Sequence, residues 1–197
     1  MELLAIEPVN ARIGASVRAL RTGAGLSLEA LAALTGVSRS ALSLIERAES
    51  SPTATVLDRI AAGLGVPLAS LFGGVVADDA EPVARRARQP VWRDPSSGYV
   101  RRSVSPTGVR SPIQIVEVTF PAGARVAFEA SATDRLVQQQ LWVLRGAIEL
   151  TVGTETYRLE KGDCLAMTLD RPTMFWNPTD EAARYAVVVV AGRNGRR

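Results

Sequence analysis

The 197-residue chain contains no histidine, and this alone excludes serine–histidine–aspartate triads, cysteine–histidine pairs and histidine metal sites. Its composition, 47% hydrophobic and 22% charged, is that of ordinary globular domains, and its net charge of +3 permits a polyanionic partner. Its single cysteine, Cys164, cannot form an internal disulfide, and neither a membrane span nor a signal peptide is recognisable, so we expect a cytoplasmic protein with no membrane partner.

Up to about residue 72, apolar residues recur at intervals of three and four, which predicts short helices. Ser27, Ser38 and either Ser51 or Thr53 stand where helix caps are expected, and Pro67 is suited to open the last helix. The pattern predicts five helices in this segment.

Residues 28–47 carry the pattern of a helix-turn-helix. A small residue, Ala32, lets two helices approach, Gly36 permits the turn between them, and Leu42 and Ile45 hold the second helix against the first. The leading end of that second helix reads SRS, which cannot contribute to a core. We therefore expect this end to face a partner outside the chain.

The stretch IGASVRALRTGAGLSLEALAALTGVSRSALSLIERAES, followed by LGVPLASLF, resembles the helix-turn-helix domain of the phage-repressor-like xenobiotic response element (XRE) family over about residues 10–72. The resemblance implies a five-helix, lambda-repressor-like domain at residues 1–72 that binds a double-stranded DNA operator through the major groove. It implies a helix cap at Ser38, base-edge contacts by Arg39 and Ser40, contacts near bases or sugar by Ser43 and Leu44, and a phosphate contact by Arg47.

Two positions depart from the family pattern: Leu28 stands where glutamine is usual, and Ala48 where glycine is usual. Residues 1–72 carry six arginines and six acids, a balance that does not favour phosphate binding. We therefore expect the acids to lie on the side away from DNA, and Arg85, Arg86 and Arg88 to add contacts from the following segment.

Residues 73–111 are rich in proline, serine and glycine, and we expect a linker with one strand near Tyr99 to Val104. After Pro112 the apolar period changes to two. Short β candidates such as IQIVEVTF, QQLWVLRG and ARYAVVVV alternate with turns, which predicts a sandwich or barrel.

From PAGARVAFEA to RYAVVVV, about residues 112–191, the chain is similar to the cupin family, a small β-barrel with an internal cavity. The skeleton of the resemblance is Gly123, Gly146, the Gly162–Asp163 turn, Pro172 and Asn177. It implies an α + β two-domain protein whose residues 112–197 form an all-β cupin (jelly-roll) barrel with a basic C-terminal tail.

Metal-binding cupins place three histidines and a glutamate inside the barrel, and the matching positions here are approximately Glu129, Ser131, Gln139 and Thr173. Hydroxyls and amides are poor ligands for transition metals, so we expect neither a metal nor another cofactor. Strand alternation puts Gln139 and its neighbours Gln138 and Gln140 on opposite faces, and the sequence leaves open which of them faces the cavity.

Two interpretations of the barrel interior stay open. In the first, the barrel is filled and serves only to dimerise the chain. In the second, a mostly apolar cavity binds a small-molecule effector. Cys164, Trp142, Trp176 and Met167 are otherwise expected to be buried. The candidate lining of the cavity is Glu129, Ser131, Gln139, Leu141, Cys164, Thr173 and Phe175.

The sequence therefore predicts a sequence-specific DNA-binding transcriptional regulator, with no enzymatic activity, that binds a palindromic operator as a homodimer formed by its barrel. One alternative is a cofactor-free isomerase or lyase that uses Glu129 as a base. Another is a scaffold whose helices bind protein.

Overall fold

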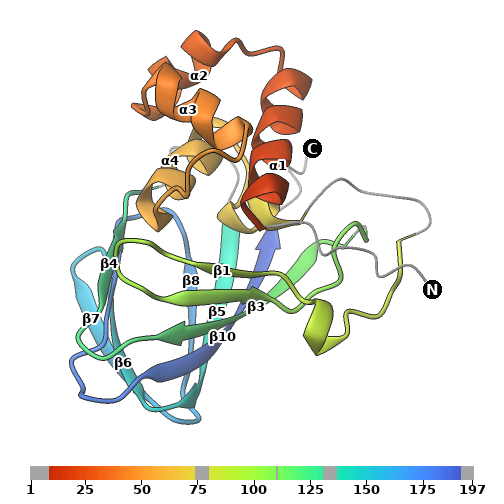
Figure 1. Ribbon diagram of the computed structural model, residues 1–197. Helices are drawn as coiled ribbons and strands as arrows, with labels where there is room; N and C mark the ends of the chain where they lie inside the picture. Colours follow the sequence, from red (N-terminus) through yellow and green to blue (C-terminus); the bar gives the residue numbers. More distant parts are fainter. Residues whose placement is uncertain (1–8, 74–79, 110, 131–136, 192–197) are drawn as a thin grey trace, which may run out of the picture.

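The computed structural model describes residues 9–73, 80–109, 111–130 and 137–191. Helices form one layer at the end of a β-domain made of two antiparallel sheets (Figure 1). This is the two-domain α + β arrangement that the sequence predicts.

The helical domain contains four α-helices, α1 (Val9–Gly23), α2 (Leu28–Thr35), α3 (Arg39–Glu46) and α4 (Ala54–Gly63). The prediction of five helices is wrong in its last member. Only five residues separate Pro67 from Gly73, too few for a stable α-helix, and they form the 3-10 helix η1 (Leu68–Phe72). The apolar stripes meet in a core that includes Ile13, Val17, Leu31, Leu42, Leu57 and Ile60, all fully buried.

The predicted caps fix where the helices begin. Ser27 and Ser38 each accept a hydrogen bond from the backbone amide three residues on, at 3.1 and 3.2 Å. Thr53, and not Ser51, does the same for α4. Gly36 ends α2 in the left-handed region with φ 66°. Because each of these side chains satisfies an amide that the helix itself cannot, the local sequence sets the register of the motif.

The β-domain consists of a six-stranded sheet in the order β1-β2-β3-β10-β5-β8 and a four-stranded sheet in the order β4-β9-β6-β7. Strands along one sheet alternate between buried and exposed side chains, as in β5, so the inner faces of the two sheets share a core. The strands are β1 (Val91–Arg93), β2 (Val100–Ser103), β3 (Ile113–Phe120), β4 (Arg125–Phe128), β5 (Val137–Arg145), β6 (Ala147–Val152), β7 (Glu155–Glu160), β8 (Cys164–Thr168), β9 (Thr173–Trp176) and β10 (Ala183–Ala191).

The segment expected as a linker contributes two strands to the larger sheet, one more than the sequence analysis anticipates. β2 lies at the predicted position, and β1 pairs with it through Trp92 opposite Arg101. A short 3-10 turn, η2 (Arg86–Arg88), precedes them. β1 is only three residues long, and Trp92, 2% exposed, is its single buried side chain.

The helical layer is joined to the β-domain by a continuous core. α4 packs against β4, and α1 against β1. The carboxylate of Asp94, at the end of β1, accepts a hydrogen bond from the Ala54 amide at the start of α4, at 3.0 Å. Aromatic rings at successive centroid distances of 5.6 to 6.3 Å lead from the helices into the barrel, in the order Phe72, Trp92, Tyr99, Phe120, Tyr185, Phe175 and Phe128.

No single helix of the described residues has the length and apolar character needed to cross a membrane. By length and composition alone, α2 and α3 together pass that test, but they are bent by 114° at the turn between them.

Candidate functional site

The first candidate site is the exposed side of α3. The 114° bend between α2 and α3 lies within the range of about 90–120° that a helix-turn-helix adopts. Leu42 and Ile45 are buried at 0% and 3% exposure, which turns the opposite side of α3 outward. The helix therefore presents its amino-terminal end and one polar face to solvent.

The predicted base-reading residues lie on that face. The Arg39 side chain is 67% exposed, and its Nε lies 2.6 Å from Oε1 of Glu29 on α2. Ser40 shares a hydrogen bond with the cap residue Ser38, with 3.1 Å between their hydroxyl oxygens. Leu44 is 38% exposed. Nothing in the described chain covers Arg39, so its guanidinium is accessible.

Arg47 lies at the other end of α3. Its guanidinium pairs with Glu49 through two bonds of 2.8 and 2.9 Å, and it also donates to the Ser43 hydroxyl. The expectation that the acids lie on the side away from DNA is therefore wrong for Glu29 and Glu49, which pair with the two arginines of the candidate surface. Exposed pairs of this kind contribute only about 0–1 kcal/mol, so a phosphate or a base can displace them.

Two contacts with α1 that the sequence analysis did not identify hold α3 in place on its buried side. A side chain at Gly14 would lie 2.4 Å from the Ile45 carbonyl oxygen, so only glycine lets α1 approach the carboxyl end of α3 this closely. Arg21 pairs with Glu46 at 2.7 and 2.8 Å and also donates to the Leu26 carbonyl. Sequence spacing gives no signal for a pair 25 residues apart.

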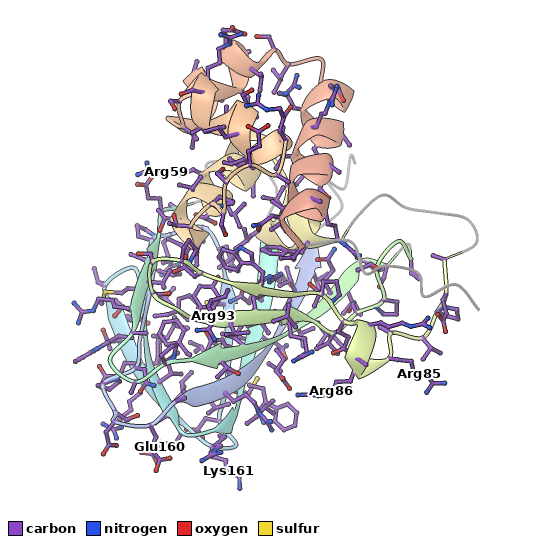
Figure 2. All side chains as sticks on the ribbon, in the orientation of Figure 1. Arg59, Arg85, Arg86, Arg93, Glu160 and Lys161 are labelled. Carbon is purple, nitrogen blue, oxygen red and sulfur yellow. The ribbon has the colours of Figure 1, made fainter. Side chains whose placement is uncertain are left out.

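The arginines of residues 85–88 do not extend this surface. Figure 2 shows Arg85 and Arg86 beside the β-domain, far from the helical layer that carries α3. Arg86 pairs with Glu117 of β3 at 3.7 Å, and Arg88 pairs with Glu81 at 3.7 Å. Within one chain these arginines therefore lie away from α3, and the expectation that they add contacts to DNA stays a prediction.

The second candidate site is a cavity between the two sheets, with η1 forming part of its wall. It has two lobes of about 90 Å³ each, here named the inner lobe, which Arg101 lines, and the outer lobe, which Asp58 lines. A water molecule needs roughly 10–15 Å³ by the same measure, so each lobe has room for more than one. The lobes are contiguous because both are lined by Pro67, Leu68, Phe128, Val137, Gln139, Leu169 and Phe175.

Three predicted lining residues face this cavity. Gln139 lines both lobes, while Gln138 and Gln140 point outward, so the structure decides between the three glutamines. Phe175 also lines both lobes, and Thr173 lines the outer one.

The remaining predicted lining residues lie elsewhere or at the edge. Glu129 borders the outer lobe, but its side chain is 71% exposed and pairs with Arg59 of α4 at 3.0 Å. Leu141 is fully buried in the core without lining either lobe. Cys164 is exposed, so its expected burial and its place in the cavity are both wrong. Ser131 lies outside the described residues.

The predicted burial of the aromatic and sulfur side chains is also wrong at Trp142, which is 51% exposed. Trp142 pairs with Cys164 across β5 and β8, so both point to the outer face of the six-stranded sheet. Hydrophobic character alone misassigned them, because strand register decides which face a side chain occupies. Trp176 and Met167 are half-buried.

Sequence reasoning missed the titratable groups that line the cavity. Tyr99, Arg101 and Tyr185 line the inner lobe, and Asp58 of α4 lines the outer lobe. Burial lowers the pKa of Arg101 to about 10 and raises the pKa of both tyrosines. Burial, with the nearby charge of Glu129, raises the pKa of Asp58 to about 7.

The residues at the metal positions of cupins do not fit a transition metal. Gln139 and Thr173 offer an amide and a hydroxyl, both weak ligands, and the carboxylate of Glu129 is engaged by Arg59. Among the described residues, no three histidine, cysteine, aspartate or glutamate side chains gather closely enough to hold a metal ion.

Comparison with known proteins supports both halves of this description. A helix-turn-helix family model matches residues 17–71, and a cupin domain model matches residues 117–190. The chain is 26% identical to the HTH-type transcriptional regulator SutR of Escherichia coli K12 over 173 residues, which cover 88% of this chain and 91% of SutR.

Other relatives carry similar descriptions. The chain is 33% identical over 150 residues to an uncharacterized HTH-type transcriptional regulator of Mycobacterium tuberculosis; this covers 75% of the chain but only half the length of that relative. A crystal structure of an HTH_3 family transcriptional regulator from Vibrio cholerae superposes with a TM-score of 0.71 at 26% identity, covering 94% of this chain and 98% of that one. The chain therefore combines an XRE-type helix-turn-helix domain with a cupin domain, and the relatives it matches are named HTH-type transcriptional regulators.

Proposed function

We propose that this DNA-binding transcriptional regulator recognises its operator through the exposed side of α3. Arg39 and Ser40 read base edges, Ser43 and Leu44 lie near bases or sugar, and Arg47 contacts phosphate. The observation that carries the proposal is the accessibility of Arg39, 67% exposed at the start of a helix that Ser38 caps. A guanidinium in that position suits a bidentate contact to guanine.

Selection of genomic fragments on the purified protein, followed by footprinting, identifies the operator. If Arg39 grips a guanine, Arg39→Ala costs about 1–3 kcal/mol of binding free energy and relaxes the preference at one operator position. Arg145→Ala is the matched control, because Arg145 is equally exposed but lies on the barrel. An equal loss on all DNA sequences contradicts base reading and assigns Arg39 to phosphate.

We propose that the barrel dimerises the chain through the outer face of the six-stranded sheet. Seven large hydrophobic side chains of the described residues are exposed, and four of them lie on this one face: Val91, Ile113, Ile115 and Trp142. Val188 of β10 lies beside Ile115 and extends this apolar surface toward β5, whereas the Arg102–Glu117 pair lies between Val91 and Trp142. A patch of this kind on a regulator suits a second copy, since a two-fold dimer matches a palindromic operator with half-sites about one helical turn, roughly 10 bp, apart.

Sedimentation at micromolar concentration tests the dimer. We expect Trp142→Glu to give a monomer that retains its fold, and Val83→Glu, at an exposed residue outside the sheets, to leave the dimer intact. A monomeric wild-type protein, or a dimeric Trp142→Glu variant, contradicts this interface.

We further propose that the barrel is a sensor and not an enzyme. We also place the domain boundary at about residue 72, so that the strands within residues 91–103 belong to the barrel. A role for Glu129 as the base of an isomerase or lyase requires a free carboxylate directed at the ligand. Exposure of Glu129 and its pairing with Arg59 speak against that role. Metal-free turnover that is abolished by Glu129→Gln contradicts the sensor assignment.

A further inference from the structure

The charged residue that lines the inner lobe is Arg101 on β2, which also borders a surface groove between α1 and β3. It belongs to a row of inward-facing side chains that crosses the larger sheet in register, formed by Trp92, Arg101, Val118, Tyr185 and Val143. All five are buried, and Arg101 is only 7% exposed. The sheet therefore holds a buried guanidinium beside the inner lobe, in a row of otherwise uncharged side chains.

This guanidinium lacks a counter-charge within the described chain. Its Nε has no hydrogen-bond partner there, and no carboxylate of the described residues is among the groups that act on it. Its pKa remains about 10 despite burial, so it is charged at neutral pH. A buried charge without a partner is unfavourable, and proteins ordinarily pair it or use it.

One stabilising contact to this charge comes from the helical domain. The Arg101 Cζ lies 4.3 Å from the centre of the Phe72 ring, a cation–π distance. Phe72 is the last residue of η1, whose first residues, Leu68 and Ala69, line the same lobe as Arg101. The helical domain thus forms part of the cavity wall close to this charge.

The rest of the inner lobe is suited to an anion with an apolar body. Two tyrosines, Tyr99 and Tyr185, line it together with Arg101, and all three side chains are buried. Phenolic hydroxyls can donate hydrogen bonds to an oxyanion. The other lining residues are mainly aliphatic and aromatic, such as Val116, Val187 and Phe120.

We propose that the barrel cavity binds a small organic carboxylate, with its anionic group against Arg101 and the hydroxyls of Tyr99 and Tyr185, and its hydrocarbon part between the sheets. A planar carboxylate matches the fork of a guanidinium. The assignment of this ligand as an effector rests on the proposed sensor function; the binding itself does not.

Thermal unfolding of the full chain with matched probes tests the proposal. A series of straight and branched monocarboxylates from acetate to hexanoate is compared with the neutral amide of each acid, at constant ionic strength. We expect at least one carboxylate to raise Tm while its amide does not. At ten times its Kd, such a ligand raises the folded-to-unfolded ratio about tenfold.

The Arg101→Met variant removes the positive charge of the side chain but keeps an unbranched side chain in its place. We expect this variant to fold with an unchanged or higher Tm, because methionine removes an uncompensated buried charge, and to lose the response to carboxylate. Arg93→Met is the control and keeps the response, since Arg93 is exposed on the neighbouring strand β1 (Figure 2).

The proposal is overturned if no carboxylate of the series raises Tm, if each amide acts as well as its acid, or if Arg101→Met responds like the wild type. Operator affinity is measured separately by fluorescence anisotropy with and without the best carboxylate. If a carboxylate binds but operator affinity does not change, the proposed sensor function is contradicted, while the proposed carboxylate site is supported.

Discussion

Ala48 closes α3 in a backbone conformation that residues with a side chain rarely adopt. Its φ is 59°, and it is the only residue other than glycine with positive φ in the described chain. Its amide donates to the Ile45 carbonyl, and the Glu49 amide donates to the Leu44 carbonyl, both at 2.9 Å. This is the Schellman arrangement that glycine usually completes. The family departure noted in the sequence is therefore a site of backbone strain.

Ala48→Gly is expected to stabilise the protein by about 0.5–1 kcal/mol, because relief of the left-handed strain exceeds the added entropy of the unfolded chain. The same substitution at the exposed Ala33, inside α2, is expected to destabilise by about 0.5–1 kcal/mol. Urea unfolding of the two variants checks both signs. Loss of stability in Ala48→Gly contradicts the strain assignment.

Asp58, which lines the outer lobe of the cavity, makes the stability of the protein depend on pH. Burial raises its pKa from 3.8 to about 7; the charge of Glu129 adds to this effect and that of Arg59 opposes it. Between these two pH values the folded protein therefore holds a proton that the unfolded chain has released. The free energy of unfolding falls as pH rises through this window, by at most about 1.4 kcal/mol per pH unit from this group.

The Asp58→Asn variant lacks the ionisable group and therefore should not show this fall in the free energy of unfolding. We expect the stability of the variant relative to wild type to rise as pH increases from about 4 to about 7 and to level off above, since Asp58 then stays ionised in both states. Denaturation over a pH series measures this difference. Asp180→Asn, at an exposed carboxylate, should follow the wild type. A pH-independent difference for Asp58→Asn contradicts the raised pKa.

At the scale of elements, the close approach of α1 to α3 sets the position of the reading helix. Gly14→Ala places a methyl group 2.4 Å from the Ile45 carbonyl oxygen and 3.0 Å from that of Glu46. Both are backbone atoms, so the helices must separate. We expect a loss of about 1–3 kcal/mol in stability together with weaker operator binding.

Gly23→Ala is the matched control, on the same helix. Nothing lies within 4 Å of the position its methyl group would take, so it should be neutral or slightly stabilising. Urea unfolding and anisotropy on the same two proteins check stability and binding together. Equal behaviour of the two variants contradicts the steric account.

Contacts between residues close in sequence allowed most helices and strands to be predicted. The errors concern the burial of individual side chains, which depends on pairing between distant strands. Ser27 and Ser38 fix helix starts by contacts within three residues, so the sequence alone places them. Trp142 and Cys164 were misplaced because their exposure depends on which face of β5 and β8 turns inward. Arg101 lies in a basic segment read as linker, and its burial follows only from the pairing of β2 between β1 and β3.

At the scale of the whole molecule, the helical layer and the barrel share one core. Phe72 is 2% exposed and contacts Trp92 with ring centroids 5.7 Å apart, while Asp94 of the β-domain accepts from the first amide of α4. Leu68 and Ala69 of η1 form part of the cavity wall. We therefore expect a ligand in the cavity to act on the placement of the helices, provided that it binds one arrangement more tightly than another.

Because of this shared core, we expect the two domains to unfold in one transition, with helical circular dichroism and tryptophan fluorescence changing together. Phe72→Ala removes the ring between Trp92 and Arg101 at a cost of about 3–5 kcal/mol and should separate the transition into two. Phe175→Ala makes the same truncation inside the barrel, so it should lower the single transition without dividing it. Two transitions in the wild type would mean that docking is too weak for a ligand in the barrel to reposition α3.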